Sequence, residues 1–430
     1  MHALLNAVST NRVLERVLPH LSEHTYLVGG CIRDLMLERE PSDFDLVTFG
    51  EPLDLAVRIE GILGGKAFPI DRERGIVRIA INHGECTLDI SPPRGADIEE
   101  DLRERDITIN AMALQPAGGV FVDPLRGHSD LREKRIRLIG KKNLLDDPLR
   151  GLRCLRFAVQ FGFSVEGQTL RLIRDHSETL SQAAPERIKH EVLKALAGTG
   201  GAAFFPLLHE AGYVRVLFGN APTALSMDTA GHAEYLLGNA DHILTGVGTH
   251  FSEELEHGMP RKAAFRLAAF LFPQTRGRPL DSPDVTPERL ALSGRARKTI
   301  HGTIAGAWRM VDLAGSDRLS GSEMYRVLSD HGGHIPEMLL LAMAGGMVTE
   351  RKDPGPIGRV CRETWRFYSD RYLSLTAAPL LSGHDILQMP GITPGAVVGR
   401  MLRQVEEARA DGLIRTRDEA LSYLRQRVKR

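Results

Sequence analysis

Two aspartates separated by one residue are the clearest chemical signal in the sequence. Asp43 and Asp45 lie in the segment Ser42-Asp43-Phe44-Asp45-Leu46. In a β-strand, residues i and i+2 share one face, so both carboxylates would project from one side while Phe44 and Leu46 enter the core. Two adjacent carboxylates are unfavourable unless a cation neutralises them, and Mg²⁺ prefers such oxygen ligands together with substrate phosphates. The pattern predicts a magnesium site where paired metal ions activate a hydroxyl and stabilise a leaving pyrophosphate.

Two further features lie near this aspartate pair. Gly29 and Gly30 follow a short apolar run and precede an expected helix that carries Arg33 in its first turn. Glycines let backbone N–H groups approach a phosphate closely, and Arg33 can bind the same anion. Asp89, in the apolar run TLDI, is the candidate for a third carboxylate from a neighbouring strand of the same sheet. An isolated Asp-x-Asp or Gly-Gly is common, but the combination at this spacing favours a site for metal-bound phosphates.

A longer motif, EEDLRERDITINAMA at residues 99–113, brings out a family resemblance. The order Gly-Gly-x-x-Arg-Asp, Asp-x-Asp, a carboxylate strand and this motif resembles the head of tRNA CCA-adding enzymes and bacterial poly(A) polymerases. These are class II members of the polymerase-β-like nucleotidyltransferases. The resemblance implies that Arg105 and Asp106 hold the ribose and phosphates of an incoming nucleotide. The family usually has a second arginine where this chain has Glu104.

Arginines and leucines recur every three residues along the segment 147–158, DPLRGLRCLRFA. An acidic residue followed by proline is typical of a helix start, and on its own the segment predicts an amphipathic helix with solvated arginines. It also resembles the family's nucleotide-selecting helix. The resemblance implies that Asp147 and Arg150 bind the Watson–Crick edge of the incoming base, while Arg153 and Arg156 help to hold the triphosphate. Bases that leave such polar groups unpaired would be rejected.

Three other segments are similar to the family. Residues 123–131 match a turn that we interpret as structural, and residues 185–191 match a helix that we interpret as a brace between head and body. The region from 381 to 430 resembles the tRNA-binding tail, with glycine turns and scattered arginines. Residues 231–275 contain four histidines but no His-Asp pair, so a phosphohydrolase module is not expected.

The elements that must position these residues change in kind along the chain. Short β-rich runs separated by turns continue to about residue 140, and helical periodicity dominates from Asp146 onward. The predicted fold class is α+β: a polymerase-β-like head with a small mixed sheet and flanking helices, then an all-α neck, body and tail. The predicted parts are a catalytic head at 1–140, nucleotide-selecting neck helices at 141–200, a helical body at 201–280, and a helical body and tail for tRNA binding at 281–430. The expected strands lie at 26–28, 44–49, 76–81, 86–90, 120–122 and 135–139, with a hairpin turn at 82–85.

Bulk composition excludes few classes of partner. Lys+Arg and Asp+Glu both total 55, so a nucleic-acid site must be a local patch. The 4 cysteines show no Cys-x-x-Cys spacing, which argues against a zinc ribbon or a disulfide framework and fits a reducing cytoplasm. No secretion signal or membrane span is expected, so we predict a cytoplasmic protein.

The resemblance implies an Mg²⁺-dependent enzyme that uses CTP and ATP to build or repair the CCA end of tRNA. The RNA 3′-hydroxyl would attack the α-phosphate of the nucleotide. A poly(A) polymerase and enzymes that add only CC or only A share these motifs, although a poly(A) polymerase is expected to carry a longer basic tail. A non-catalytic RNA-binding protein and a small-molecule nucleotidyltransferase are alternatives from other classes. The intact acidic and arginine residues oppose the first, and the long helical body opposes the second. The oligomeric state stays open.

Overall fold

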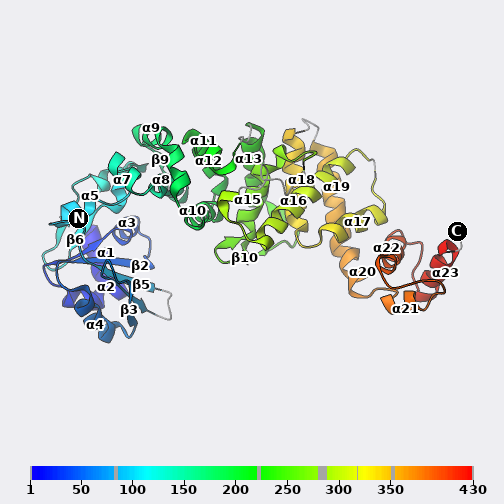
Figure 1. Cartoon of the computed structure of the whole chain (residues 1–430), viewed down its shortest axis with the longest axis horizontal. Helices are drawn as coiled ribbons and strands as arrows, with labels where there is room; N and C mark the ends of the chain where they lie inside the picture. The colour runs from blue at the N-terminus through cyan, green and yellow to red at the C-terminus, as the bar shows by residue number, and fades with distance from the viewer. Residues whose placement is uncertain are drawn as a thin grey trace. The chain divides into compact units, whose positions relative to one another are not determined.

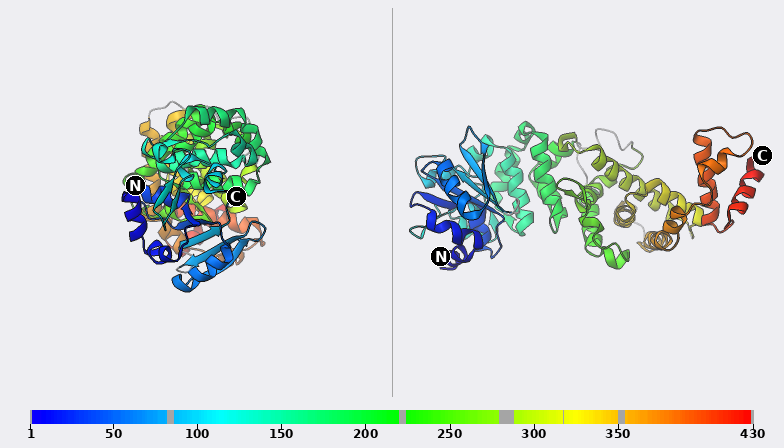
Figure 2. Two further views of the ribbon diagram at one scale, coloured as in Figure 1. Left: turned by 90° about the vertical axis from the view of Figure 1, so that its left-hand side faces the viewer. Right: turned by 90° about the horizontal axis from the view of Figure 1, so that it is seen from below.

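The computed structural model describes residues 2–81, 86–219, 224–278, 288–316, 318–349 and 354–428. The chain forms two compact units, the first comprising 1–195 with 210–216 and the second 196–209 with 217–430. The larger sheet belongs to the first unit, and the second is almost entirely helical (Figures 1 and 2). The α+β prediction is therefore confirmed. The four-part division stays a prediction, and the predicted turn at 82–85 lies outside the described residues.

The first unit is built on one mixed sheet. Within the described residues its strand order is β3-β4-β5-β2-β1-β6-β7. β2 and β5 are parallel, and the other neighbours are antiparallel. The strands are β1 (Thr25–Val28), β2 (Asp43–Thr48), β3 (Lys66–Asp71), β4 (Ile76–Ile81), β5 (Cys86–Ser91), β6 (Ala113–Gln115) and β7 (Val120–Val122).

Two of these strands were not predicted. β3 contains Pro69, which has no N–H for the ladder, and it is tolerated because β3 lies at the edge of the sheet. β6 is too short for a periodic signal. The strand predicted at 135–139 is shorter than expected, since only β8 (Arg135–Ile136) forms and pairs with β9 (Ser164–Val165).

Alternation along β2 separates the core from the candidate site, as predicted. Phe44 and Leu46 are buried, whereas Asp43 is exposed and Asp45 is half-buried. Asp45 lies opposite Asp89 of β5 in the parallel register. Both carboxylates therefore project from the same face of the sheet.

Short helices flank this sheet, and others carry the rest of the first unit. They are α1 (His2–Thr10), α2 (Arg12–Val17), α3 (Gly30–Met36), α4 (Pro52–Leu63), α5 (Ile98–Arg103), α6 (Gly127–Arg132), α7 (Lys141–Asp146), α8 (Leu149–Phe161), α9 (Gly167–Asp175) and α10 (Pro185–Ala197). α8 begins directly after Asp147-Pro148, as the sequence predicts.

The second unit is organised around α18 (Ile335–Thr349). This helix is buried on all sides from Ile335 to Gly346, and it packs against α13, α16 and α19. A helix that is apolar all round belongs at the centre of a bundle. The longer helices of the unit are α13 (Ala224–Gly238), α15 (Arg261–Leu271), α16 (Gly294–Leu313), α17 (Gly321–His331), α19 (Pro354–Phe367), α22 (Ala396–Ala410) and α23 (Arg417–Val428).

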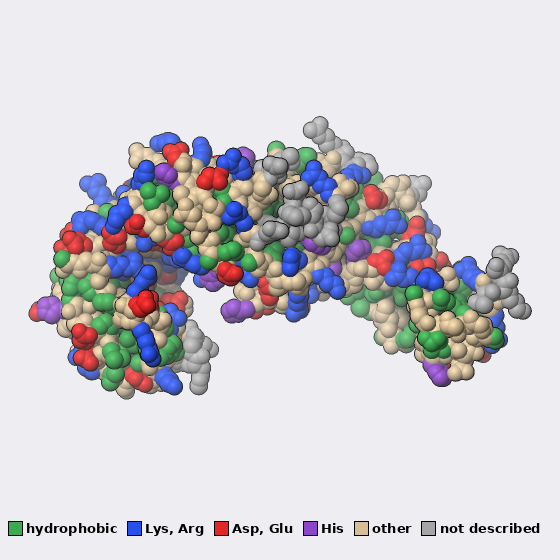
Figure 3. Space-filling view, viewed as in Figure 1, with side chains coloured by type: hydrophobic (Ala, Val, Ile, Leu, Met, Phe, Trp, Pro, Cys, Tyr) green, Lys and Arg blue, Asp and Glu red, His purple; other side chains and the backbone are tan. Residues whose placement is uncertain are grey.

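The face of the molecule seen in Figure 3 shows no segregation of charge by sign. Lys and Arg side chains are interspersed with Asp and Glu over the visible face, as the equal totals imply (Figure 3). Among the described residues, no helix is long and apolar enough to cross a membrane.

Candidate active site

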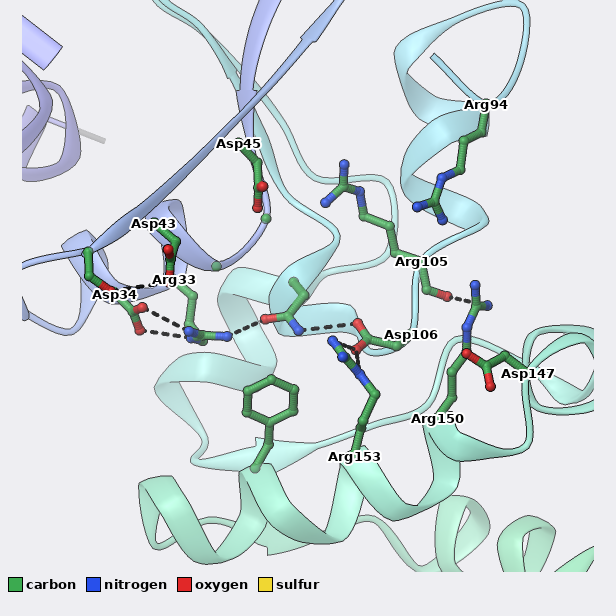
Figure 4. Close-up of a pocket in the computed structure, with 15 residues that line it drawn as sticks. Arg33, Asp34, Asp43, Asp45, Arg94, Arg105, Asp106, Asp147, Arg150 and Arg153 are labelled. Atoms are coloured by element: carbon green, nitrogen blue, oxygen red, sulfur yellow. Dashed lines mark hydrogen bonds and ion pairs between the residues drawn. The ribbon is translucent and has the colours of Figure 1, made fainter. Parts of the chain in front are cut away.

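One cavity of about 410 Å³ collects most of the predicted site residues (Figure 4). Those that line it are Gly29, Gly30, Arg33, Asp43, Asp45, Arg105, Asp106, Asp147, Arg150 and Arg153. The other lining residues are Asp34, Ser42, Arg94, Asn110 and Phe157. The cavity thus combines the turn before α3, strand β2, the segment after α5 and the start of α8. Of the predicted residues, Asp89 and Arg156 lie outside its lining.

Asp43 and Asp45 are the two acidic side chains of β2. The Asp43 Oδ1 accepts a hydrogen bond from Thr87 Oγ1 at 2.7 Å. Withdrawal from water raises the pKa of Asp45 from 3.8 to about 6; Arg105 opposes this shift, while the charges of Asp89 and Asp43 add to it. In the part of the chain that the structure describes, neither aspartate forms an ion pair. Such a like-charge pair suits a divalent cation with oxygen preference.

The donor set from the protein is small. No group of three or more His, Cys, Asp or Glu side chains among the described residues could hold a metal ion. Asp34, Asp106 and Asp147 also line the cavity, but each is paired with an arginine. This leaves Asp43 and Asp45 as candidate ligands, and further ligands would come from substrate phosphates and water, as is usual for Mg²⁺.

Asp89 is beside Asp45 but is already paired. Its two oxygens accept hydrogen bonds from Arg78 Nε and Nη2, both at 2.7 Å. Arg78 lies directly opposite Asp89 on β4, so the sheet register holds this bidentate pair together. The role predicted for Asp89 stays a prediction. Arg78 was missed by the sequence reasoning, although its position between Val77 and Ile79 in a strand signals an outward-facing charge.

Gly29 has to be glycine. Its φ is +79°, and a Cβ at this position would lie 2.8 Å from Arg105 Nη1 and 3.1 Å from Asp45 Oδ2. Its N–H donates to the Met112 carbonyl at 3.2 Å. The missing side chain thus lets the Arg105 guanidinium and the Asp45 carboxylate approach the same point of the backbone.

A chain of paired charges forms the wall on the α8 side. Arg33 donates to both oxygens of Asp34 at 2.9 and 2.8 Å and to Asn110 Oδ1 at 2.5 Å. Asn110 donates in turn to Asp106 Oδ1 at 3.1 Å. Asp106 Oδ2 accepts from Arg153 Nε at 2.9 Å. Burial alone would raise the pKa of Asp106, but Arg153 and the hydrogen bonds from Ile107 and Asn110 outweigh it, and the pKa is held below its ordinary value.

Arg156 continues this network away from the cavity. It is buried, and its Nε donates to Glu191 Oε2 of α10 at 2.5 Å. Glu191 also lies 3.7 Å from Arg153 Nη1. Arg156 does not line the cavity, and it is connected to Arg153 through their shared partner Glu191. Its predicted contact with a triphosphate stays a prediction that this geometry does not support.

The predicted base-selecting pair lies at the start of α8. Asp147 accepts from the Leu149 N–H at 3.2 Å and from Arg187 Nη2 at 2.8 Å. Arg150 Nη1 donates to the Arg105 carbonyl at 3.1 Å. Asp147 is therefore held by a helix start and by α10, and Arg150 keeps further N–H groups for another partner.

Arg94 is a lining residue that the sequence reasoning missed. Its backbone N–H donates to Asp101 Oδ1 at 3.1 Å, while Asp101 Oδ2 accepts from Nε and Nη2 of Arg105 at 3.1 and 3.0 Å. One buried carboxylate thus positions both residues. The available signal was the rigid turn Pro92-Pro93-Arg94-Gly95 directly after the Asp89 strand.

The turn at 123–131 has structural contacts, in agreement with its interpretation. Asp123 accepts from the N–H groups of Gly127 and His128, and the fully buried Asp130 accepts from Thr108 at 2.6 Å. The helix at 185–191 is the start of α10, which contacts the cavity residues through Arg187 and Glu191.

Comparisons with known proteins agree with this architecture. A model described as the poly A polymerase head domain matches residues 25–97 and 82–137, and one described as a probable RNA- and SrmB-binding site of polymerase A matches 162–224. A CC-adding tRNA nucleotidyltransferase of Geobacter sulfurreducens is 30% identical over 98% of this chain and 97% of its own. An A-adding tRNA nucleotidyltransferase of Deinococcus radiodurans is 28% identical over 95% and 96%. The fold is similar to that of a Thermotoga maritima CCA-adding enzyme complexed with tRNA, with a TM-score of 0.71, 23% identity and 98% of each chain covered.

Proposed function

The chain belongs to the tRNA nucleotidyltransferase family, and on that premise we propose that it adds cytidine and adenosine nucleotides from CTP and ATP to the 3′ end of tRNA. The observation that carries the proposal is the convergence of two chemistries in one cavity. Asp43 and Asp45 supply a carboxylate pair that forms no ion pair within the described residues, and Asp147 and Arg150 supply acceptors and donors for a base. The nucleotide is then chosen by side chains, so no template strand is required.

The metal-binding role falls to Asp43 and Asp45, with Mg²⁺ as the proposed ion. Bound divalent ions would supply Lewis-acid activation of the RNA 3′-hydroxyl and stabilisation of the departing pyrophosphate. Asp43 is exposed and oriented by Thr87, whereas Asp45 is set deeper beside Gly29. Asp89 supports this pair from the next strand, where Arg78 neutralises it.

Phosphate binding is assigned to three arginines, each of which is paired with a carboxylate. Arg105 is anchored through Asp101, and its Nη1 lies beside the Gly29 turn next to Asp45. Arg33 and Arg153 form ion pairs with Asp34 and Asp106, and these pairs fix the shape and the electrostatic potential of the site. Their remaining N–H groups complete the phosphate contacts.

Base selection is proposed to rest on Asp147 and Arg150. The carboxylate of Asp147 accepts from the amino group of cytosine or adenine, and Arg150 donates to the ring acceptors. Because Arg187 and the Leu149 N–H already orient Asp147, the pair is rigid enough to leave a wrong base unsatisfied.

A narrower activity, the addition of CC alone, is the second candidate. It is favoured by the relatives from Geobacter sulfurreducens and Thermus thermophilus, both 30% identical and both named CC-adding. The relatives are bacterial, and we place the reaction in the cytoplasm.

The deciding experiment uses tRNA transcripts that end at the discriminator base, at C or at CC. Each is incubated with purified protein, Mg²⁺ and CTP, ATP or both, and the products are resolved on a sequencing gel. Growth that stops at CCA establishes the full activity, and growth that stops at CC establishes the narrower one. Long A-tails on any RNA would indicate a poly(A) polymerase, and no extension of any transcript would contradict the proposal.

A further inference from the structure

Two phenylalanine rings pack against the arginines that line the active-site cavity. Phe157 and Phe161 lie four residues apart on α8, and their rings stack with centroids 5.7 Å apart and an angle of 3° between their planes. Residues at this spacing share one face of a helix. Phe157 is buried and lines the cavity, whereas Phe161 is half-buried and lies outside the lining. None of the chemistry proposed above uses this pair.

Three guanidinium groups lie against the Phe157 ring. The Cζ atoms of Arg156, Arg33 and Arg153 lie 3.8, 5.2 and 5.8 Å from its centroid. A cation within about 6 Å of an aromatic centroid is attracted to the negative face of the ring. Arg33 comes from α3 and Arg153 from α8, and both line the cavity (Figure 4). One ring thus contacts two of the three arginines to which phosphate binding is assigned.

Phe161 adds two more contacts of the same kind. Its centroid lies 4.7 Å from the Cζ of Arg33 and 5.0 Å from that of Arg39. Arg33 therefore lies against both rings of the stacked pair. An aliphatic side chain of similar size has no negative face, so the aromatic character of these two positions is what attracts the arginines.

The Phe157 ring stabilises crowded cations without using their N–H groups. The pKa of Arg156 is held below its ordinary value, first by its removal from water and further by the like charge of Arg153, although Glu191 opposes this shift. A further carboxylate in place of the ring would occupy N–H donors that an anionic ligand needs, whereas a ring face occupies none. Each of the three arginines already has one carboxylate partner: Arg33 has Asp34, Arg153 has Asp106 and Arg156 has Glu191.

We propose that Phe157 is a positioning residue for the triphosphate of the incoming nucleotide. Its ring holds the guanidinium groups of Arg33 and Arg153 in place and leaves their remaining N–H groups to bind phosphate oxygens. The inference rests on the proposed function, which assigns these two arginines to phosphate. Base selection is assigned to Asp147 and Arg150, so a weaker negative face at Phe157 should weaken the binding of every triphosphate equally, whatever its base.

The test changes the electron density of the ring and keeps its shape. Phenylalanine that carries one, two or three fluorine atoms replaces Phe157 in the full chain, because each fluorine weakens the negative face with little change in volume. The affinities for CTP, ATP and inorganic tripolyphosphate are measured by calorimetry with Mg²⁺ and without RNA. We expect all three affinities to fall stepwise, by about tenfold in total for the trifluorinated ring, which is the size expected of partly buried cation–π contacts.

The same fluorinated series at Phe205 is the matched control. Phe205 is fully buried and stacks on Phe270 with centroids 4.0 Å apart, and within the described residues no guanidinium group lies over either ring. The three affinities should stay within about twofold of the wild type in this series, since no cation there responds to the ring.

Kinetics separate a role toward the nucleotide from a general loss of structure. Along the Phe157 series the KM for CTP and ATP should rise, while the KM for tRNA stays within about twofold. Affinities that stay constant along this series, or that fall for one nucleotide but not for tripolyphosphate, overturn the inference. If the affinity for tripolyphosphate follows the series but the wild type extends no transcript, the proposed function fails and the positioning role of Phe157 stands.

Discussion

The two walls of the active-site cavity treat charge in opposite ways. On the α8 side a chain of paired groups runs from Asp34 through Arg33 and Asp106 to Arg153. On the sheet side Asp43 and Asp45 have none among the described residues, and the raised pKa of Asp45 records the cost. We infer from this difference that the paired residues stabilise the shape of the site, whereas Asp43 and Asp45 bind a ligand. It also predicts which substitutions reduce stability and which reduce only activity.

The largest expected effect is on the unpaired wall. Asp45→Asn should lower kcat by at least about 10²–10³-fold, equivalent to roughly 3–4 kcal/mol, because the variant lacks a proposed metal ligand. Its pKa is about 6 in the folded chain against an ordinary 3.8, so the folded state loses stability as pH rises through this range. The variant should therefore have a higher Tm than the wild type above pH 6. A lower Tm above pH 6 would mean that other groups stabilise the charged form of Asp45 in the folded protein. Asp54→Asn on α4 serves as the surface control.

Substitutions among the paired charges should reduce stability more than activity. Arg156→Met leaves the buried Glu191 with only the more distant Arg153, and we expect a loss of about 3 kcal/mol in the free energy of unfolding. Urea denaturation measures this loss. kcat at low temperature should fall far less than for Asp45→Asn, since Arg156 does not line the cavity. Arg171→Met, on the exposed face of α9, should change stability by less than about 0.5 kcal/mol.

Gly29 lies next to both Arg105 and Asp45. Its substitution should therefore reduce both stability and activity. Gly29→Ala introduces a side chain at φ +79° and against Arg105 Nη1, which should cost about 2 kcal/mol of stability together with activity. Gly61→Ala in α4 meets nothing within 4 Å and should stabilise the protein by up to about 1 kcal/mol. The comparison uses urea denaturation and single-turnover rates. Full activity in Gly29→Ala would show that Arg105 and Asp45 do not have to approach this backbone.

The smallest expected effect concerns the one paired carboxylate on the sheet side. Arg78→Met removes the ion-pair partner of Asp89. The affinity for Mn²⁺, measured by EPR, should then rise about fivefold, which is the size expected of a modest charge interaction near the surface. In an Asp89→Asn background the same substitution should have a much smaller effect. Equal effects in both backgrounds would mean that Arg78 acts only as a distant charge and that Asp89 is not restrained by it.

The sequence predicted the parts of the site that depend on local periodicity. The alternation of Asp43 to Leu46 set the strand and its outward face, and Asp147-Pro148 set the start of α8. The three-residue spacing of the arginines does not keep them on one face, because each step turns about 60° short of a full helical turn. Arg156 therefore points about 120° away from Arg150 and reaches α10 instead of the cavity.

Other features depend on contacts that the sequence does not display. β3 was missed because Pro69 is acceptable only at an edge, and the edge is defined by the whole sheet. Arg78 and Arg94 were missed because the first depends on a cross-strand partner and the second on a hydrogen bond to the side chain of Asp101. The place of Arg94 in the cavity lining therefore follows only from the folded structure.

Asp101 has a consequence for how this enzyme can evolve. One of its oxygens holds the backbone of Arg94 at the groove, and the other holds the guanidinium of Arg105 at the cavity. A substitution that shifts this carboxylate therefore moves two arginines that line the cavity at once. The positions of Arg94 and Arg105 are linked through one side chain, so a lineage that alters residue 101 changes both.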